Sequence, residues 1–380
     1  MLSCQRDAFS IPDGVHYFNC ASMAPLLRSA EAAGTAGLQR QRLPVAASPA
    51  DYFAEPTRLR ETIARLINCE TSRIALTPAV SYGVAIAANN LELHAGQNVV
   101  VVEDEFPSDV YPWMRACEHA GATLRTVARA PDSTSWNTAV LEHIDANTAL
   151  VCVSTVNWTD GLRFDVGRIG ERCRAVGAVF VVDGTQSIGA APFDFAQIQP
   201  DLLVCAGYKW LLGPYQMGFA AVGDRLLEGE PFELHWSTRA GSEDTSNTAY
   251  HPRFRAGARR FDVGEQNNPI TVPMLTAGVQ QVLDWSVASI AEYLAALATE
   301  IDAGLNPEHH VLVPERDRDA HILGIRLQQP EYIDTTIAAL KRANVQVSKR
   351  GSIVRVAPHL HCDSGSVAAL LQALEDAARA

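Results

Sequence analysis

The sequence predicts an α/β fold, with a large, doubly wound, mainly parallel sheet and a smaller α+β domain at the C-terminal end. Two observations support this prediction. Short apolar runs rich in β-branched residues alternate with amphipathic stretches, and the runs lack the polar alternation of half-exposed strands. Apolar runs of this kind are typical of parallel strands that are buried on both faces. Alternation of strands with helices is typical of a doubly wound sheet.

The large domain is expected to span residues 20–265. Its buried strands are predicted at 97–102, 149–153, 178–182 and 202–205. Helical spacing predicts helices over 110–121 and 166–177, and the latter segment ends at a glycine, which commonly terminates helices. Residues 73–90 have the pattern of a strand, a turn and the start of a helix.

The pattern of predicted elements changes to α+β after residue 265, and we expect residues 1–19 and 266–380 to form the small domain. Its predicted elements are a helix at 289–305, strands at 321–327 and 352–356, and helices at 334–343 and 367–378. Residues 237–260 are rich in Gly, Ser, Thr, Asn and Arg and are expected to form a long loop. Such loops in compact enzymes are often functional.

Composition narrows the class of protein. The chain has 380 residues, 47% of them hydrophobic, which is ample for a buried core and excludes wholesale disorder. Its net charge of −12 disfavours nucleic acid or an anionic membrane surface as the main partner. The eight cysteines include no C-x-x-C pair, and we interpret them as reduced thiols. The sequence shows no secretory signal pattern and no apolar run of membrane length, so a cytoplasmic location is expected.

Two charged residues follow neighbouring predicted strands. Asp183 comes directly after the strand at 178–182, and Lys209 follows the strand at 202–205. The carboxyl ends of strands face the ligand crevice of an open α/β sheet, so both side chains are expected at one site. A lysine with a buried carboxylate suits pyridoxal phosphate, because the lysine binds the aldehyde and the carboxylate keeps the ring nitrogen protonated. Taken singly, Asp183 could be a turn former and Lys209 a surface lysine; together they favour a cofactor site.

The run V-D-G-T-Q-S-I-G around Asp183 and the run A-G-Y-K-W-L-L-G-P around Lys209 resemble the cofactor-lysine segment of the class V aminotransferase family. This family of fold-type I pyridoxal-phosphate enzymes includes cysteine desulfurases, selenocysteine lyases, kynureninase and isopenicillin N epimerase-like enzymes. The resemblance implies that Lys209 is the catalytic, Schiff-base lysine and that Asp183 and Gln186 contact the cofactor ring. Tyr208 stands at a position that usually helps to bind the cofactor phosphate.

Further cofactor-binding residues follow from the same resemblance. Ala79, Val80 and Ser81 stand where the family holds the phosphate with backbone amides and a hydroxyl, and a helix N-terminus favours such an anion. Phe106 stands where an aromatic side chain stacks on the cofactor ring. Taken alone, Ser81 could simply cap a helix and Phe106 could be a core residue.

The match is less complete at other positions. An asparagine commonly contacts the ring oxygen in the family; here the spacing puts Trp158 at that position, with Asn157 beside it. Arg355, in an apolar strand, would be costly to bury without an anion, and it matches the family arginine that binds the substrate α-carboxylate. His359 and His361 lack a third metal ligand at suitable spacing, so we interpret them as structural and expect no metal.

The resemblance also implies a homodimer. In the family, the region of the arginines at 253, 255, 259 and 260 enters the active site of the neighbouring subunit. A threonine that touches the partner's phosphate usually follows the glycine at position 264; here Glu265 follows, and its charge would repel the phosphate. Either this contact is lost or the register differs. Alternatively, the arginine cluster is simply solvated.

The expected substrate is a small amino acid. The resemblance implies that it displaces Lys209 to form an external aldimine and that the freed lysine acts as base at Cα. An aminotransferase-like enzyme is the first hypothesis, with β-elimination of a C–S or C–Se bond and epimerisation as alternatives. In the desulfurases of the family, the persulfide-carrying cysteine lies in the small domain ahead of the C-terminal arginine. Here residues 206–361 contain no cysteine and Cys362 follows Arg355, so the resemblance disfavours a persulfide-forming desulfurase. A non-catalytic cofactor-binding protein is disfavoured by the retention of Lys209, Asp183, Gln186 and Arg355.

Overall fold

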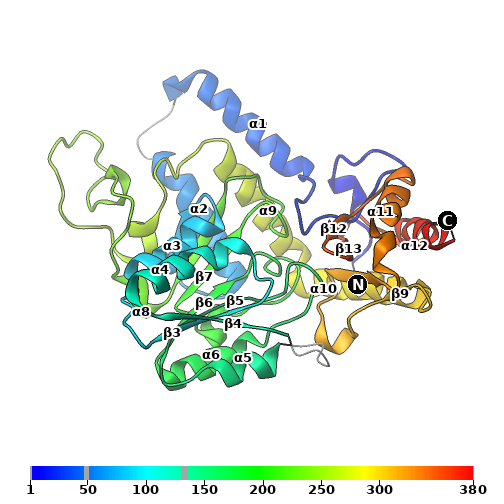
Figure 1. Cartoon of the computed structure of the whole chain (residues 1–380). Coiled ribbons are helices and arrows are strands. Elements are labelled where there is room, and N and C mark those ends of the chain that lie inside the picture. Colours follow the sequence, from blue (N-terminus) through cyan, green and yellow to red (C-terminus); the bar gives the residue numbers. More distant parts are fainter. Residues whose placement is uncertain (1, 47–50, 130–135, 380) are drawn as a thin grey trace.

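The computed structural model describes residues 2–46, 51–129 and 136–379. Its largest element is a seven-stranded sheet with the order β2-β8-β7-β6-β5-β3-β4 (Figure 1). Within this sheet only β8 runs antiparallel to its neighbours, so the prediction of a mainly parallel sheet is confirmed. The strands are β2 (Ile74–Thr77), β3 (Asn98–Val102), β4 (Thr123–Val127), β5 (Thr148–Ser154), β6 (Val179–Asp183), β7 (Leu202–Ala206) and β8 (Gly218–Val222).

The four strands predicted with definite bounds form within one residue of them, as β3, β5, β6 and β7, and the strand expected at the start of residues 73–90 forms as β2. Strand β8 was not among the predicted elements. It follows β7 after the connection at 207–217, which carries Lys209, and the two strands pair as an antiparallel hairpin.

Helices cover both faces of the sheet. Along β3, Val99 and Val101 point to one face and Val100 and Val102 to the other, as the two-residue period of a strand requires. Helices α3 and α4 pack on the first face, and α2, α5, α6 and α9 pack on the second. The helices of this part are α2 (Asp51–Ile67), α3 (Val80–Asn90), α4 (Tyr111–Ala120), α5 (Asn137–His143), α6 (Val166–Val176), α7 (Phe195–Ile198), α8 (Asp224–Leu227) and α9 (Thr271–Trp285). As predicted, α6 ends at Gly177, which has the left-handed φ of 80°.

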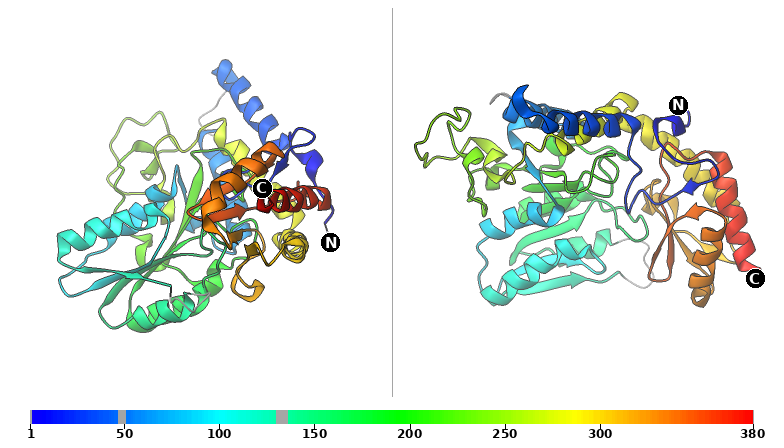
Figure 2. Two further views of the ribbon diagram at one scale, coloured as in Figure 1. Left: turned by 45° about the vertical axis from the view of Figure 1, so that its right-hand side comes forward. Right: turned by 90° about the horizontal axis from the view of Figure 1, so that it is seen from above.

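The C-terminal part forms a four-stranded antiparallel sheet, β12-β13-β10-β9, packed with helices (Figure 2). The N-terminal segment joins this part, because β1 pairs in parallel with β11. The elements are β1 (His16–Tyr17), α10 (Val287–Gly304), β9 (His310–Val311), β10 (Leu323–Leu327), α11 (Ile333–Arg342), β11 (Val345–Gln346), β12 (Ser348–Arg350), β13 (Ile353–Val356) and α12 (Ser364–Ala378). Helix α12 begins three residues before its predicted bound, because the Asp363 carboxylate caps it by accepting the Ser366 N–H at 2.8 Å.

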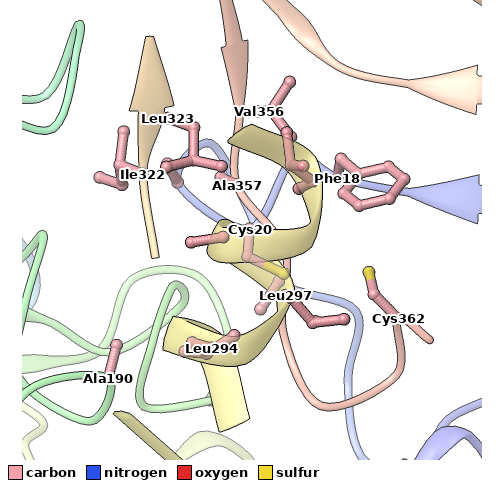
Figure 3. Packing of buried hydrophobic residues seen from close by; sticks show 14 of the residues in the cluster. Phe18, Cys20, Ala190, Leu294, Leu297, Ile322, Leu323, Val356, Ala357 and Cys362 are labelled. Carbon is pink, nitrogen blue, oxygen red and sulfur yellow. The ribbon is translucent and has the colours of Figure 1, made fainter. Parts of the chain in front are cut away.

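The core of the C-terminal part also contains residues from the other parts of the chain (Figure 3). Phe18 and Cys20 of the N-terminal segment pack with Leu297 of α10 and with Cys362, which lies just before α12. Ala190 belongs to the same cluster. The cluster joins residues from both sides of the expected boundary, and the division into 20–265 and 1–19 with 266–380 stays a prediction. The eight cysteines are free thiols, and six of them are buried.

Helix α1 (Arg28–Arg42), which was not predicted, lies along α9 (Figure 2). Small residues permit this close packing: a Cβ atom on Gly37 would lie 2.0 Å from the carbonyl oxygen of Pro269. Within the described residues, no single helix is long and apolar enough to span a membrane. Helices α9 and α10 meet the same length and composition criteria only together, as a pair bent by 75°.

Candidate active site

A cavity of about 320 Å³ opens where β5, β6 and β7 end. Most of the residues predicted for the cofactor site line it, namely Ala79, Val80, Ser81, Phe106, Trp158, Asp183, Gln186, Tyr208 and Lys209. The other lining residues are Pro78, Ser108, Ser154, Thr185, Ala206, Tyr215 and Gln216. The structure therefore brings nine predicted residues to one cavity at the carboxyl edge of the sheet, while Asn157 and Arg355 lie outside its lining.

Lys209 lies in the hairpin between β7 and β8. The hairpin closes tightly because residue 207 is a glycine: a Cβ atom on Gly207 would lie 2.7 Å from the carbonyl oxygen of Met217. The Lys209 side chain is only 7% exposed, and its Nζ atom lies 5.6 Å from the centre of the Phe106 ring. The pKa of Lys209 is lowered to about 8, chiefly by burial; the charges of Arg355 and Arg350 also lower it, while Asp183 and Cys205 oppose the shift.

The lowered pKa of Lys209 predicts how cofactor-free protein attaches pyridoxal phosphate. Only the neutral amine can attack an aldehyde, and a pKa lowered from 10.5 to about 8 makes the amine neutral at lower pH. The attachment rate, followed by visible absorbance, should therefore rise with pH and level off above about 8. A rate that keeps rising to the ordinary lysine value of 10.5 would show that Lys209 is not desolvated as the structure indicates.

Asp183 is the last residue of β6 and is held by the turn that follows. Its Oδ1 atom accepts the backbone N–H of Thr185 at 2.7 Å, and Thr185 Oγ1 accepts the N–H of Ala206 at 3.0 Å. This pair of hydrogen bonds ties the end of β6 to the end of β7. The carboxylate of Asp183 and the amine of Lys209 are thereby fixed on adjacent strands, as the sequence predicts.

Gln186 lines the cavity, but its carboxamide has partners within the protein. Nε2 donates to the carbonyl oxygen of Ala21 at 3.1 Å, and Oε1 accepts from Trp210 Nε1 at 3.1 Å. One amide hydrogen of Gln186 therefore remains for a cofactor oxygen. Its predicted contact with the cofactor ring stays a prediction.

The N-terminus of α3 forms another wall of the cavity. Ala79 is the N-cap residue and has no side chain that can cap the helix, so the first N–H groups face the cavity without a side-chain acceptor. Gly83 allows this helix to lie against the sheet, because a Cβ atom there would lie 2.6 Å from Val204 Cγ1. Helix N–H groups and the Ser81 hydroxyl are suited to bind a phosphate at this point.

Aromatic rings shape the rest of the cavity. Phe106 meets Trp158 edge-to-face, with ring centres 5.9 Å apart, and Tyr208 lies 4.5 Å from Tyr215. Asn157, in contrast, is buried, and its Oδ1 atom accepts the N–H of Thr159 at 2.9 Å. The Asn157 side chain thus stabilises its own loop, and Trp158 is the member of the predicted pair that lines the cavity.

Arg355 lies next to the cavity beneath Trp158. Its side chain is buried and donates to the carbonyl oxygen of Trp158 at 2.6 Å, to Ser348 Oγ at 3.1 Å and to Ser22 Oγ at 2.8 Å. Arg350 donates to the same Ser22 hydroxyl at 3.0 Å. In the described ranges neither guanidinium has a carboxylate partner. Burial, and then the charge of Arg350, lower the pKa of Arg355 to about 9, so a substrate anion at this point would stabilise both cations.

The two histidines interpreted as structural lie behind Lys209, in the core. His359 stacks on Trp210 with ring centres 6.0 Å apart, and His361 Nε2 donates to the carbonyl oxygen of Tyr17 at 2.8 Å. Burial lowers the pKa of His359 to about 3. Across the described residues no group of His, Cys, Asp or Glu could hold a metal ion.

The interpretation of the arginine cluster as solvated is wrong for two of its members. Arg255 and Arg260 are buried, and they pair with Glu243 at 2.7 Å and with Glu228 at 2.6 Å. Glu243 lies within the loop and Glu228 precedes it. These ion pairs form only when the loop is folded, and the local sequence does not predict that fold. Glu265 adopts a left-handed φ of 58°.

Several residues near the site were not predicted. Tyr215 lines the cavity, and Ser22 and Arg350 lie beside Arg355; none of them belongs to a segment with a recognisable pattern, and only the tertiary fold brings them there. Glu105 and Asp109 could have been predicted near the site from the sequence, because they follow the buried strand β3 at the same edge of the sheet as Asp183.

The residues present fit pyridoxal phosphate. The cavity offers an amine for the aldehyde, a carboxylate for the ring nitrogen, an aromatic face for the ring and an uncapped helix N-terminus for the phosphate. Combined with a doubly wound sheet and a smaller C-terminal part, this cavity places the protein among the fold-type I pyridoxal-phosphate enzymes.

The family follows from comparison with known proteins. The aminotransferase class-V family model matches residues 50–367, and the chain belongs to that family. It is a pyridoxal-phosphate-dependent enzyme, as the sequence predicts.

Among curated relatives, isopenicillin N epimerase of Streptomyces clavuligerus is 31% identical over 256 residues, which cover 64% of this chain and 63% of the relative. A cysteine desulfurase of Enterobacter sp. (strain 638) is 26% identical over 243 residues, covering 63% and 59%. The chain thus spans less than two thirds of the length of these relatives. The uncharacterized aminotransferase YcbU of Bacillus subtilis (strain 168) is 24% identical over 307 residues, covering 80% of this chain and 78% of the relative.

Solved structures match nearly the whole chain. The cystine C-S lyase C-DES, in complex with its reaction product cysteine persulfide, superposes with a TM-score of 0.87 and 22% identity over 96% of this chain and 98% of the other. An apo cysteine desulfurase from Thermococcus onnurineus NA1 superposes with a TM-score of 0.86 and 18% identity, covering 99% and 98%. At these identities the matches establish the fold.

Proposed function

We propose that this enzyme transfers the amino group of an amino acid, with Lys209 as the single proton-transfer base at Cα. The observation that supports this proposal most is the lining of the cavity. Lys209 is the one amine among the described lining residues, which include neither a histidine nor a cysteine. The side chain across from its amine is Phe106, which cannot exchange a proton.

The roles of the other residues follow from their positions. Lys209 would hold the cofactor covalently, Asp183 would face its ring nitrogen, and the first turn of α3 would bind its phosphate. When bound, the cofactor supplies an electron sink that stabilises negative charge at the substrate Cα. Arg355, supported by Ser22, would bind the α-carboxylate and so present the Cα–H bond to the amine of Lys209. A pKa of about 8 suits an amine that must both take and return this proton.

The same geometry disfavours two other activities. Epimerisation by two bases requires a second proton donor on the face of Cα opposite Lys209, and we infer that Phe106, which cannot donate a proton, would cover that face. A persulfide carrier requires an accessible thiolate, whereas Cys362 is buried in the core and its pKa is raised to about 12 by burial. β-Elimination is the second candidate, because it also requires a single base on one face, which Lys209 supplies.

One assay separates these activities. The purified protein, loaded with pyridoxal phosphate, is incubated with single amino acids, with and without a keto acid acceptor. Consumption that requires the acceptor and yields its amino acid supports the proposal. Acceptor-independent release of pyruvate and ammonia would replace it with β-elimination, and inversion of the Cα configuration would overturn the single-base assignment. No consumption of any amino acid would overturn the proposed function.

We also infer that the enzyme is a homodimer. Residues 229–256 project from the body of the molecule (Figure 1) and expose large apolar side chains, among them Leu234, Trp236 and Tyr250. A hollow of about 1090 Å³ lies among these residues, away from Lys209. Large apolar side chains that are exposed together on one projecting segment are typical of a protein interface.

Substitution of Trp236 tests the dimer. Sedimentation velocity should give a dimer for the wild type and a shift toward monomer for Trp236→Glu, because a charge there would be buried without a partner. Tyr332→Glu is the matched control, since Tyr332 is similarly exposed but lies in the C-terminal part. A monomeric wild type, or an equal shift in both variants, would contradict this interface.

A further inference from the structure

Three carboxyl groups lie together behind the cavity. Glu105 and Asp109 follow β3, and Asp183 ends β6. All three side chains are buried, and Asp109 is 0% exposed. The positive charge of Lys209 favours the ionised form of Asp109. Three ionised carboxylates beside one ammonium would be strongly unfavourable in such a dry environment.

The hydrogen-bond donors are distributed unequally among these carboxyls. Glu105 accepts from the N–H of Phe106 at 2.8 Å and from the N–H and hydroxyl of Ser154 at 3.0 and 2.6 Å. Asp183 accepts from the N–H of Thr185. Neither oxygen of Asp109 has a donor anywhere in the described part of the chain. Both Asp109 and Asp183 are buried at the same edge of the sheet, and Asp183 is the neighbouring carboxyl that acts most strongly on Asp109.

A hydrogen bond between two carboxyls requires a proton on one of them, because an ionised carboxylate can only accept. Asp109 is the member of the pair that lacks any other donor, and it is the more deeply buried. Burial raises the pKa of Asp109 well above its ordinary value, and the neighbouring charges of Asp183 and Glu105 add to this effect, while Lys209 opposes it. Cys152 also faces the pair, and burial keeps its thiol neutral by raising its pKa.

We propose that Asp109 is protonated in the working enzyme and donates its hydroxyl hydrogen to the Asp183 carboxylate. Asp109 is then a positioning residue, which acts on the cofactor through Asp183. A donated hydrogen bond favours the ionised form of the acceptor and fixes its orientation. The inference rests on the proposed role of Asp183 toward the cofactor ring nitrogen.

Infrared spectroscopy of the protein loaded with pyridoxal phosphate, and of the cofactor-free protein, tests the protonation state. The difference spectrum of wild type minus Asp109→Asn at neutral pH should contain the C=O stretching band of a protonated carboxyl. The difference with Glu105→Gln is the matched control and assigns any band that belongs to Glu105. Loss of ionised-carboxylate bands in Asp109→Asn, in place of the protonated band, would overturn the proposal. This result does not depend on whether the enzyme is an aminotransferase.

A second pair of variants tests the positioning role. Asp109→Asn keeps a donor of similar shape, and Asp109→Leu fills the space without one. Hydrogen bonds to charged groups contribute about 1.5–3 kcal/mol, so the dissociation constant for pyridoxal phosphate should rise about tenfold or more in Asp109→Leu and about twofold or less in Asp109→Asn. Both variants are compared by thermal unfolding, so that a folding defect is recognised.

Equal weakening in both variants, or unchanged affinity in Asp109→Leu, would show that Asp109 does not act by donating a hydrogen bond. If the wild-type protein bound no pyridoxal phosphate at all, the proposed function would fail, while the infrared result would still decide the state of Asp109.

Discussion

Replacing Lys209 with alanine should lower kcat with any amino acid substrate by at least about 10³-fold and abolish covalent retention of the cofactor. The protein then loses both its point of attachment and its base at Cα, and general-base catalysis alone contributes about 10²–10⁴-fold. Cofactor retention after dialysis, followed by visible absorbance, and steady-state turnover measure the two losses separately.

Lys349→Ala is the matched control, because Lys349 is half-exposed and pairs with Asp334 away from the cavity. Its turnover and cofactor retention should equal those of the wild type. Turnover in Lys209→Ala close to the wild-type rate would refute the assignment of the base, whatever the state of the cofactor.

Replacing Arg355 should mainly weaken substrate binding. Arg355→Met keeps most of the buried volume and removes the guanidinium, and loss of one partner of a buried charge pair costs about 2–5 kcal/mol. KM for amino acids should therefore rise about 30-fold or more, while kcat changes much less. Steady-state kinetics with an amino acid and with its amide, which lacks the α-carboxylate, should show that the loss is specific to the acid.

Ser348→Ala is the control for this substitution. It removes one hydrogen bond to Arg355 but leaves the contacts with Trp158 and Ser22, so a much smaller rise in KM is expected. An unchanged KM in Arg355→Met would mean that the α-carboxylate binds elsewhere, and Arg350 would then be the guanidinium to replace.

The sheet and the ends of its strands were predictable because they depend on local patterns. The apolar runs that became β5, β6 and β7 are buried on both faces, and their composition alone indicates this. Asp183 and Lys209 could then be assigned to one site, because the carboxyl ends of neighbouring parallel strands meet at the same edge. The sequence runs around these two residues indicated the resemblance to the class V aminotransferase family.

Other features depend on contacts that the sequence does not specify. Arg350 and Arg355 both donate to the Ser22 hydroxyl. Arg350 lies 328 positions and Arg355 lies 333 positions from Ser22 in the chain, so no local pattern predicts these contacts. The burial of Arg255 depends on the fold of a long loop. The proposed protonation of Asp109 depends on the carboxyl of Asp183, which is distant in the sequence. Helix α1 has small residues where it meets α9, so it lacks the broad apolar face that would predict it.

The fold explains why two of the cysteines are apolar core residues. Figure 3 shows Cys20 and Cys362 among the apolar side chains of the C-terminal core. The absence of cysteine from residues 206–361 leaves the described lining of the cavity without a thiol. This lining agrees with the proposed role of Lys209 as the base.

Mapping the covalent attachment site tests the central claim most directly. The protein is loaded with pyridoxal phosphate, reduced with borohydride to fix the covalent link, digested and analysed by mass spectrometry. The adduct should be found on the peptide that contains Lys209, at one equivalent per chain, and it should be absent from Lys209→Ala. An adduct on another lysine, or no adduct in the wild type, would contradict the account of this active site.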